Sequence, residues 1–251
     1  MAVVFVVWLI FAIGLNWGGA STDLFEILVG NTSAILHGEV WRLFTAPFMH
    51  APSGPGAVGH MLWAVLGIYF LGTRLEEAWG SARFLRFVLA TAVLSYVLQM
   101  LAEVVLPASL GARLVGDAWF GLMPAVTAIS IAWALTFRGE TVRLMFVLPV
   151  TSGMLIVFII VMALLRVAVA DMQPEGLLAP FGGMLLGWLL GGGTPSPLRK
   201  AWLKLKLARL DNEARREGKR RRPRPNPGGL RVIPGGRTDD DDKGPDGRWL
   251  N

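Results

Sequence analysis

Six apolar stretches in the first 190 residues constrain the fold of this chain more than any other feature of its sequence. Charged residues are sparse between these stretches, and the whole chain is 53% hydrophobic and only 17% charged. A soluble domain carries about 25% charged residues, so the composition excludes an ordinary soluble enzyme and predicts an all-α polytopic membrane protein. The six stretches span residues 2–15, 57–71, 87–102, 118–137, 144–165 and 177–190.

The six stretches differ in length. About 20 residues of helix cross an average bilayer core, and only 118–137 and 144–165 reach that length. The shorter stretches predict either incomplete helices or a bilayer that is locally thinned around the protein. No basic residue precedes the first stretch, which favours a retained helix over a cleaved signal peptide.

Basic residues are distributed unevenly around the predicted helices. Residues 1–193 carry 8 basic and 10 acidic side chains, whereas residues 194–251 carry 16 basic and 8 acidic ones. Because basic residues near helix ends stay in the cytoplasm, we expect an integral membrane protein with both termini cytoplasmic. The absence of eukaryotic sorting motifs and the compact six-helix core favour a bacterial inner membrane. The cytoplasmic side would hold Arg74, Arg83, Arg86, Arg138, Arg143, Arg199, Lys200, Lys204, Lys206 and Arg209, and the other side Arg42, Arg113 and Arg166.

The end of the chain differs in composition from the apolar part. We expect a transmembrane domain over 1–192, a basic cytoplasmic segment with helical character over 193–222, and a disordered tail rich in Pro, Gly and Asp over 223–251. The basic segment either only fixes the topology, or binds anionic membrane lipids, or binds an acidic partner. A nucleic acid is the least favoured partner, because no aromatic residue interleaves the basic run 219–222.

The residue types limit the possible chemistry. The chain has no cysteine, which excludes disulfides, thiolate metal sites and cysteine nucleophiles. Its three histidines, His37, His50 and His60, are too few for a His-rich metal site. We therefore predict neither a metal nor a cofactor.

Four short patterns occur in order along the apolar part. They are the Trp41-Arg42 pair within 38–50, the segment 59–81 that begins Gly59-His60, the turn 119–126, and the glycine-rich run 179–187. Together they resemble the rhomboid superfamily of intramembrane serine proteases and their inactive relatives. The resemblance covers residues 1–192 and implies a six-transmembrane helical bundle.

The resemblance also indicates where catalytic residues would stand. Active rhomboids carry a serine in a Gly-x-Ser-Gly turn, and the matching turn, which begins at Gly121, has Met123 at that place. They carry a histidine in an Ala-His-x-x-Gly motif, where this chain has Pro180. Their second helix pairs a histidine with an asparagine, and here His60 is retained while Ala64 replaces the asparagine.

These three replacements remove the groups that acyl transfer requires. A hydroxyl or thiol nucleophile must lie within hydrogen-bond reach of a base. Met123 is a thioether, Pro180 has no basic side chain, and Ala64 cannot donate a hydrogen bond to an oxyanion. We checked Ser95, Ser109 and Ser130 as alternative nucleophiles, and none stands in a recognisable motif.

The remaining motif residues fit structural roles best. The ladder Gly182, Gly183, Gly187 and Gly191 predicts close packing between helices. Trp41 and Arg42 either contact a client or anchor their loop at the membrane interface, and we favour anchoring.

The sequence therefore predicts a catalytically inactive rhomboid-like protein that recognises transmembrane segments of client membrane proteins. One alternative is an active rhomboid serine protease with a non-standard site. Another is a membrane anchor whose basic tail binds anionic lipid or a partner.

Overall fold

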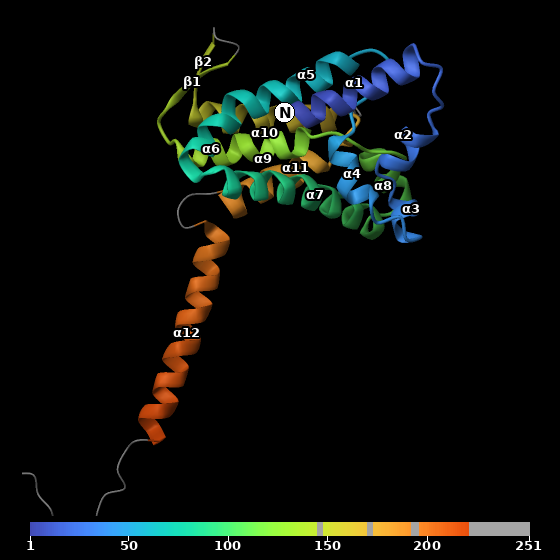
Figure 1. Ribbon diagram of the computed structural model, residues 1–251. Helices are drawn as coiled ribbons and strands as arrows, with labels where there is room; N and C mark the ends of the chain where they lie inside the picture. Colours follow the sequence, from blue (N-terminus) through green and yellow to red (C-terminus); the bar gives the residue numbers. More distant parts are fainter. Residues whose placement is uncertain (145–147, 170–172, 192–195, 221–251) are drawn as a thin grey trace, which may run out of the picture. The chain divides into compact units, whose positions relative to one another are not determined.

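The computed structural model describes residues 1–144, 148–169, 173–191 and 196–220. The chain divides into two units, Met1–Leu203 and Lys204–Asn251. The described part is mostly helical (Figure 1). Its elements are α1 (Ala2–Asn16), α2 (Asp23–Leu28), α3 (Thr32–Leu36), α4 (Arg42–Thr45), η1 (Ala46–Phe48), α5 (Ala57–Gly67), η2 (Ile68–Gly72), α6 (Thr73–Trp79), α7 (Ser81–Val105), α8 (Ala108–Val115), α9 (Met123–Thr136), β1 (Thr141–Leu144), β2 (Leu148–Thr151), α10 (Ser152–Ala168), α11 (Ala179–Gly191) and α12 (Pro197–Arg220).

Each of the six apolar stretches contains a helix. Within the part of the chain that the structure describes, two helices are long and apolar enough to cross a bilayer: the continuous run Ala57–Trp79, with 23 residues, and Ser81–Val105, with 25. The run 57–79 extends beyond the predicted end at residue 71 because η2 is a wider π-helical turn that continues directly into α6. The apolar helices α1, α9, α10 and α11 are shorter.

Two of the predicted boundaries are wrong. The stretch 118–137 becomes helical only at Met123, because residues 119–122 form an irregular turn with Gly121 at φ +116°. The stretch 144–165 becomes helical only at Ser152, after an antiparallel hairpin of β1 and β2. Pro149 lies in the second strand of this hairpin, and the Thr151 side chain accepts a hydrogen bond from Met154 N, which fixes the start of α10.

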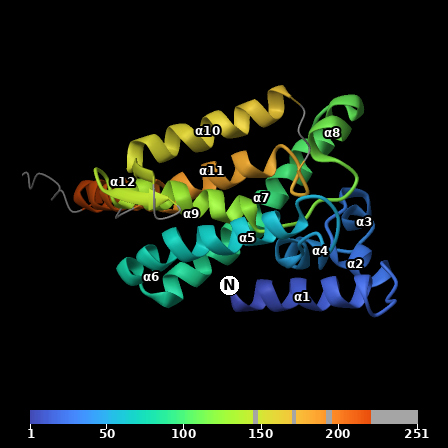
Figure 2. The same ribbon diagram turned by 90° about the horizontal axis from the view of Figure 1, so that it is seen from above.

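The helix α9 lies at the centre of the first unit. Ten of its 14 residues are buried, including Ile129 and Trp133. It packs against α7, α10 and α11 and also contacts α5 and α6. Figure 2 shows α10 and α1 on opposite sides of α5 and α9. A helix buried on all sides is apolar around its whole circumference, and α9 has this character.

The outer helices carry apolar side chains on their exposed faces. On α10 these include Met154, Val157, Phe158, Ile160 and Val161, and α1 and α7 carry similar residues. A soluble protein rarely exposes continuous apolar faces of this kind. The faces fit contact with lipid hydrocarbon, as expected for an integral membrane protein.

Candidate functional site

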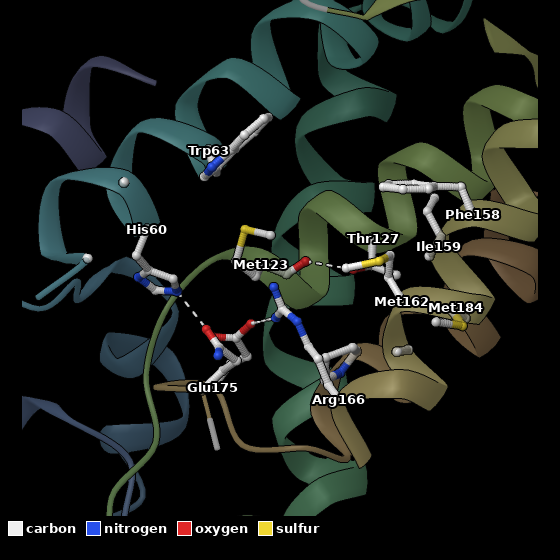
Figure 3. A pocket seen from close by; sticks show the side chains of 15 residues that line it. His60, Trp63, Met123, Thr127, Phe158, Ile159, Met162, Arg166, Glu175 and Met184 are labelled. Carbon is white, nitrogen blue, oxygen red and sulfur yellow. Dashed lines mark hydrogen bonds and ion pairs between the residues drawn. The ribbon is translucent and has the colours of Figure 1, made fainter. Parts of the chain in front are cut away.

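A cavity of about 480 Å³ lies among α5, α9, α10 and α11 and the segment that precedes α11 (Figure 3). We call it the main cavity. Its walls are largely apolar, and its polar side chains gather near the segment before α11. Its lining residues are Gly56, Gly59, His60, Trp63, Met123, Thr127, Phe158, Ile159, Met162, Ala163, Arg166, Gln173, Glu175, Pro180 and Met184.

Three of the four positions matched to catalytic rhomboid residues line the main cavity. His60 comes from α5, Met123 from the first turn of α9, and Pro180 from the first turn of α11. The fourth position, Ala64, is completely buried in the hydrophobic core and is not among the lining residues. The structure thus brings His60, Met123 and Pro180 to one cavity from three separate helices.

A buried acidic residue forms the polar end of the main cavity. Glu175 lies in the segment before α11, and its side chain is 1% exposed. His60 Nε2 donates to Glu175 Oε2 at 3.1 Å, and Arg166 Nη1 lies 3.6 Å from Glu175 Oε1. Figure 3 shows both groups pointing at the carboxylate from different helices. A buried carboxylate is tolerated when it is paired and hydrogen-bonded, and Glu175 has a partner at each oxygen.

Two segments beside the cavity are held by hydrogen bonds. Gly121 N donates to Ala46 O at 3.0 Å, and Tyr96 Oη donates to Gly121 O at 2.7 Å. A Cβ at Gly121 would lie 2.7 Å from His60 Cε1, so glycine is required for both its positive φ and its space. On the other segment, Ala179 N donates to Gln99 Oε1 at 2.8 Å, which fixes the start of α11.

Hydroxyl groups near the cavity are engaged elsewhere. Ser95 Oγ and Ser130 Oγ are buried and donate to carbonyls of their own helices, Thr91 O and Val126 O, at 2.6 and 2.8 Å. Neither serine lines the main cavity. Among the described lining residues, Thr127 alone carries a hydroxyl, and it donates to Met123 O at 3.0 Å.

A second histidine, His50, lies beside His60 with its ring tilted by 44° from the His60 ring. The His50 and His60 rings lie 5.1 Å apart between centroids, and His50 is 1% exposed. Burial, together with the charge of His60, lowers the pKa of His50 from 6.5 to about 4. His50 is therefore neutral at physiological pH and is suited to packing rather than to proton transfer there.

Trp41 and Arg42 lie outside the main cavity. Arg42 is buried, where it donates to Glu39 Oε2 at 2.6 Å, to Val29 O at 2.8 Å and also to Glu26 O. These bonds tie α2 to α4. Trp41 is half-exposed and donates to Ile27 O at 3.3 Å. Arg42 thus has a structural role in this loop.

The glycine ladder lies against neighbouring backbone. A Cβ at Gly183 would lie 2.1 Å from Pro124 O, and one at Gly187 would lie 2.6 Å from Ala128 O, both on α9. A Cβ at Gly182 would lie 3.2 Å from Ser95 Cα on α7. These glycines let α11 approach α9 and α7 at backbone distance.

The sequence analysis missed Glu175, Arg166 and Thr127. Glu175 and Arg166 are nine residues apart in sequence and carry no motif. One signal was present: an acidic residue beside the predicted sixth stretch has to be solvated or paired. Thr127 stands one helical turn after Met123 and therefore on the same face of α9.

The family model described as "Rhomboid domain" matches residues 37–195, which include every residue that lines the main cavity. The chain is also 31% identical over 84 residues to "Rhomboid protease GluP" of Bacillus subtilis (strain 168). That match covers 33% of this chain and only 16% of the length of the relative.

Proposed function

This chain belongs to the rhomboid family, and from that membership we propose that it is a catalytically inactive member, a pseudoprotease, which binds transmembrane segments of other membrane proteins. The observation that carries the proposal is the lining of the main cavity. The matched nucleophile and base positions hold Met123 and Pro180, and His60 pairs with Glu175 instead of a nucleophile.

The chemistry of the lining supports inactivity. A serine protease needs a hydroxyl, a base within about 3 Å of it, and donors for the oxyanion. Thr127 has the only hydroxyl among the described lining residues, and its hydrogen goes to Met123 O. Nε2 of the retained His60 is bonded to Glu175. No described nucleophile–base pair remains in this cavity.

The rim of the cavity supports binding of an apolar segment. Trp63 on α5 and Phe158 and Met162 on α10 line the cavity and are also exposed on the outer surface of the described helices. A segment in the membrane could therefore reach the cavity between α5 and α10 without passing through water. Aromatic and methionine side chains adapt to varied apolar partners.

Short helices provide a second physical reason for client binding. At about 1.5 Å per residue, α1 (15 residues) and α11 (13 residues) are roughly 20–22 Å long, shorter than a bilayer core of about 30 Å. A bilayer that is thinned around these helices lowers the free-energy cost of keeping a short or polar client helix in the membrane. We further propose six membrane crossings, cytoplasmic termini and a bacterial inner membrane.

Site-specific photocrosslinking in intact cells tests the proposal. A photoreactive residue replaces Trp63 or Phe158 at the cavity rim, and Leu89 or Leu101 on the exposed face of α7 serves as the control. We expect the rim positions to capture membrane proteins several times more efficiently than the α7 positions, with the adducts mapping to transmembrane segments. Equal capture from both sets, or no capture, would contradict the proposal.

An active protease with a non-standard site is the alternative, and Thr127 is its best candidate for a nucleophile. The threonine faces the main cavity from the same side of α9 as Met123. Substrate cleavage that is lost in Thr127→Val and kept in Ser130→Ala would establish this alternative.

Another alternative gives the main function to the tail. The first half of α12 carries Arg199, Lys200, Lys204, Lys206 and Arg209 and no acidic residue before Asp211. Each basic residue near an anionic bilayer contributes about 1 kcal/mol. Deletion of residues 194–251 separates the readings, because client capture from the rim persists if the helical domain is responsible.

A further inference from the structure

Arg166 is the most exposed charged side chain among the described residues that line the main cavity. The side chains of Glu175 and His60 are 1% and 10% exposed, whereas that of Arg166 is 34% exposed. Glu175 and His60 are also bonded to each other. An anionic group that enters the cavity therefore meets the guanidinium as its accessible cation.

Arg166 meets Glu175 through an ion pair and not through a close hydrogen bond. A guanidinium has five N–H donors in a planar fork. Its contact with Glu175 is 3.6 Å between Nη1 and Oε1, which is longer than a normal hydrogen bond. Glu175 therefore compensates the charge of Arg166 without a close hydrogen bond to Nη1.

Apolar side chains extend from Arg166 along one face of α10. Phe158 and Met162 stand eight and four residues before it, so all three share that face. At about 1.5 Å per residue, they lie roughly 12 and 6 Å from Arg166 along the helix axis. Trp63 faces them across the cavity (Figure 3). The cavity therefore fits an apolar body with one hydrogen-bond acceptor near its end.

We propose that the clients of this protein are transmembrane segments that carry a carboxylate side chain, Asp or Glu, within about two turns of one end, and that Arg166 binds this carboxylate. This inference rests on the proposed function. A planar carboxylate matches the guanidinium fork with two parallel hydrogen bonds. A charged side chain is costly in a membrane helix unless it is paired, so pairing with Arg166 would favour such segments over the same segments left unpaired in lipid.

The test uses the full-length protein in lipid nanodiscs, with the photoreactive residue at Phe158. The probes are synthetic single-span segments in both orientations, identical except for Glu, Gln or Leu at a position two turns from one end. We expect capture of the Glu segment to exceed that of the Gln and Leu segments by about tenfold. Arg166→Gln should abolish this preference, so that the Glu, Gln and Leu segments are captured to the same extent.

Two further variants sharpen the result. Arg166→Lys keeps the charge and loses the fork, so it should retain only part of the preference. Arg74→Gln removes an exposed arginine whose partner, Glu140, lies outside the main cavity, and it should have no effect.

Two results would overturn the inference, and they are distinguishable. Equal capture of the three segments by the unmodified protein would refute carboxylate recognition and leave the proposed binding of transmembrane segments standing. Capture of none of them would refute both.

Discussion

The helix α9 has two sides that differ in packing. On the side toward α11, glycines bring the two backbones together, and Gly183 and Gly187 leave no room for a side chain. On the side toward α10, Met123 and Thr127 face the main cavity, and α10 buries only Ser152, Leu155 and Ala163. One side is the centre of the fold and the other is an open site.

This difference separates the residues that hold the fold from those that would perform the chemistry. The glycines and Tyr96, which donates to Gly121 O, keep the elements in place. The matched catalytic positions Met123 and Pro180 line the cavity without carrying any reactive group. A family fold can persist after its catalytic groups are replaced, because packing and catalysis depend on different side chains.

The largest expected loss of stability is on the side of α9 that packs against α11. Gly183→Val places a branched side chain where a Cβ alone would lie 2.1 Å from Pro124 O. Because the obstacle is backbone, we expect a loss of more than about 3 kcal/mol in the free energy of unfolding. The measurement is the unfolding midpoint in detergent. The control is Gly153→Ala on α10, where a Cβ meets nothing within 4 Å and the helix should gain up to about 1 kcal/mol. Equal effects of the two variants would contradict the comparison.

The second largest loss of stability is expected at Glu175, the buried acidic residue of the main cavity. Glu175→Gln leaves Arg166 without its charge partner and replaces an acceptor of the His60 bond. Because Arg166 is partly exposed, we expect a loss of about 1–3 kcal/mol in the free energy of unfolding. Glu140→Gln breaks the exposed pair with Arg74 and should cost less than about 1 kcal/mol. If Glu175→Gln and Glu140→Gln lost the same free energy of unfolding, Glu175 would have no special role in stability.

The pKa of His50 predicts a pH dependence. Its folded value of about 4 lies below the ordinary 6.5, so between these values the unfolded chain binds more protons and stability falls as pH falls. We expect His50 to account for a loss of about 1–2 kcal/mol in the free energy of unfolding between pH 7 and pH 5. Unfolding measured over this range should be less pH-dependent in His50→Gln and unchanged in the exposed His37→Gln.

The smallest effect is expected on the open side of α9. Met123→Ala removes contacts in an existing cavity, so it should cost about 1 kcal/mol or less in the free energy of unfolding. Ile129→Ala, in the completely buried part of the same helix, should cost about 2–5 kcal/mol. A costly Met123→Ala would mean that the cavity side is packed as firmly as the core.

Much of this architecture could be predicted from local patterns. Membership of the rhomboid superfamily, predicted from four motifs, is confirmed by the match over residues 37–195. The apolar stretches located the helices, since lipid-facing and buried positions are both apolar. The hairpin of β1 and β2 was missed because the apolar residues Leu148, Pro149 and Val150 of its second strand continue the apolar stretch of the helix that follows.

The polar end of the cavity could not be predicted in the same way. His60, Arg166 and Glu175 come from α5, α10 and the segment before α11, and only the tertiary fold brings them together. Ala64 was matched to an oxyanion donor, but it lies in the core and not at the cavity. Motif matching finds positions in a known pattern, whereas an ion pair outside that pattern leaves no periodic signal.

We propose that this rhomboid-family protein does not cleave peptides. The direct test is proteolysis by the purified protein in liposomes, with a generic rhomboid substrate, a serine-reactive fluorophosphonate probe and an active rhomboid as control. We predict no cleavage and no labelling of the chain, in the same vesicles in which the control shows both. Cleavage of the substrate, with or without labelling, would contradict the claim, and its loss in Thr127→Val would identify the hydroxyl responsible.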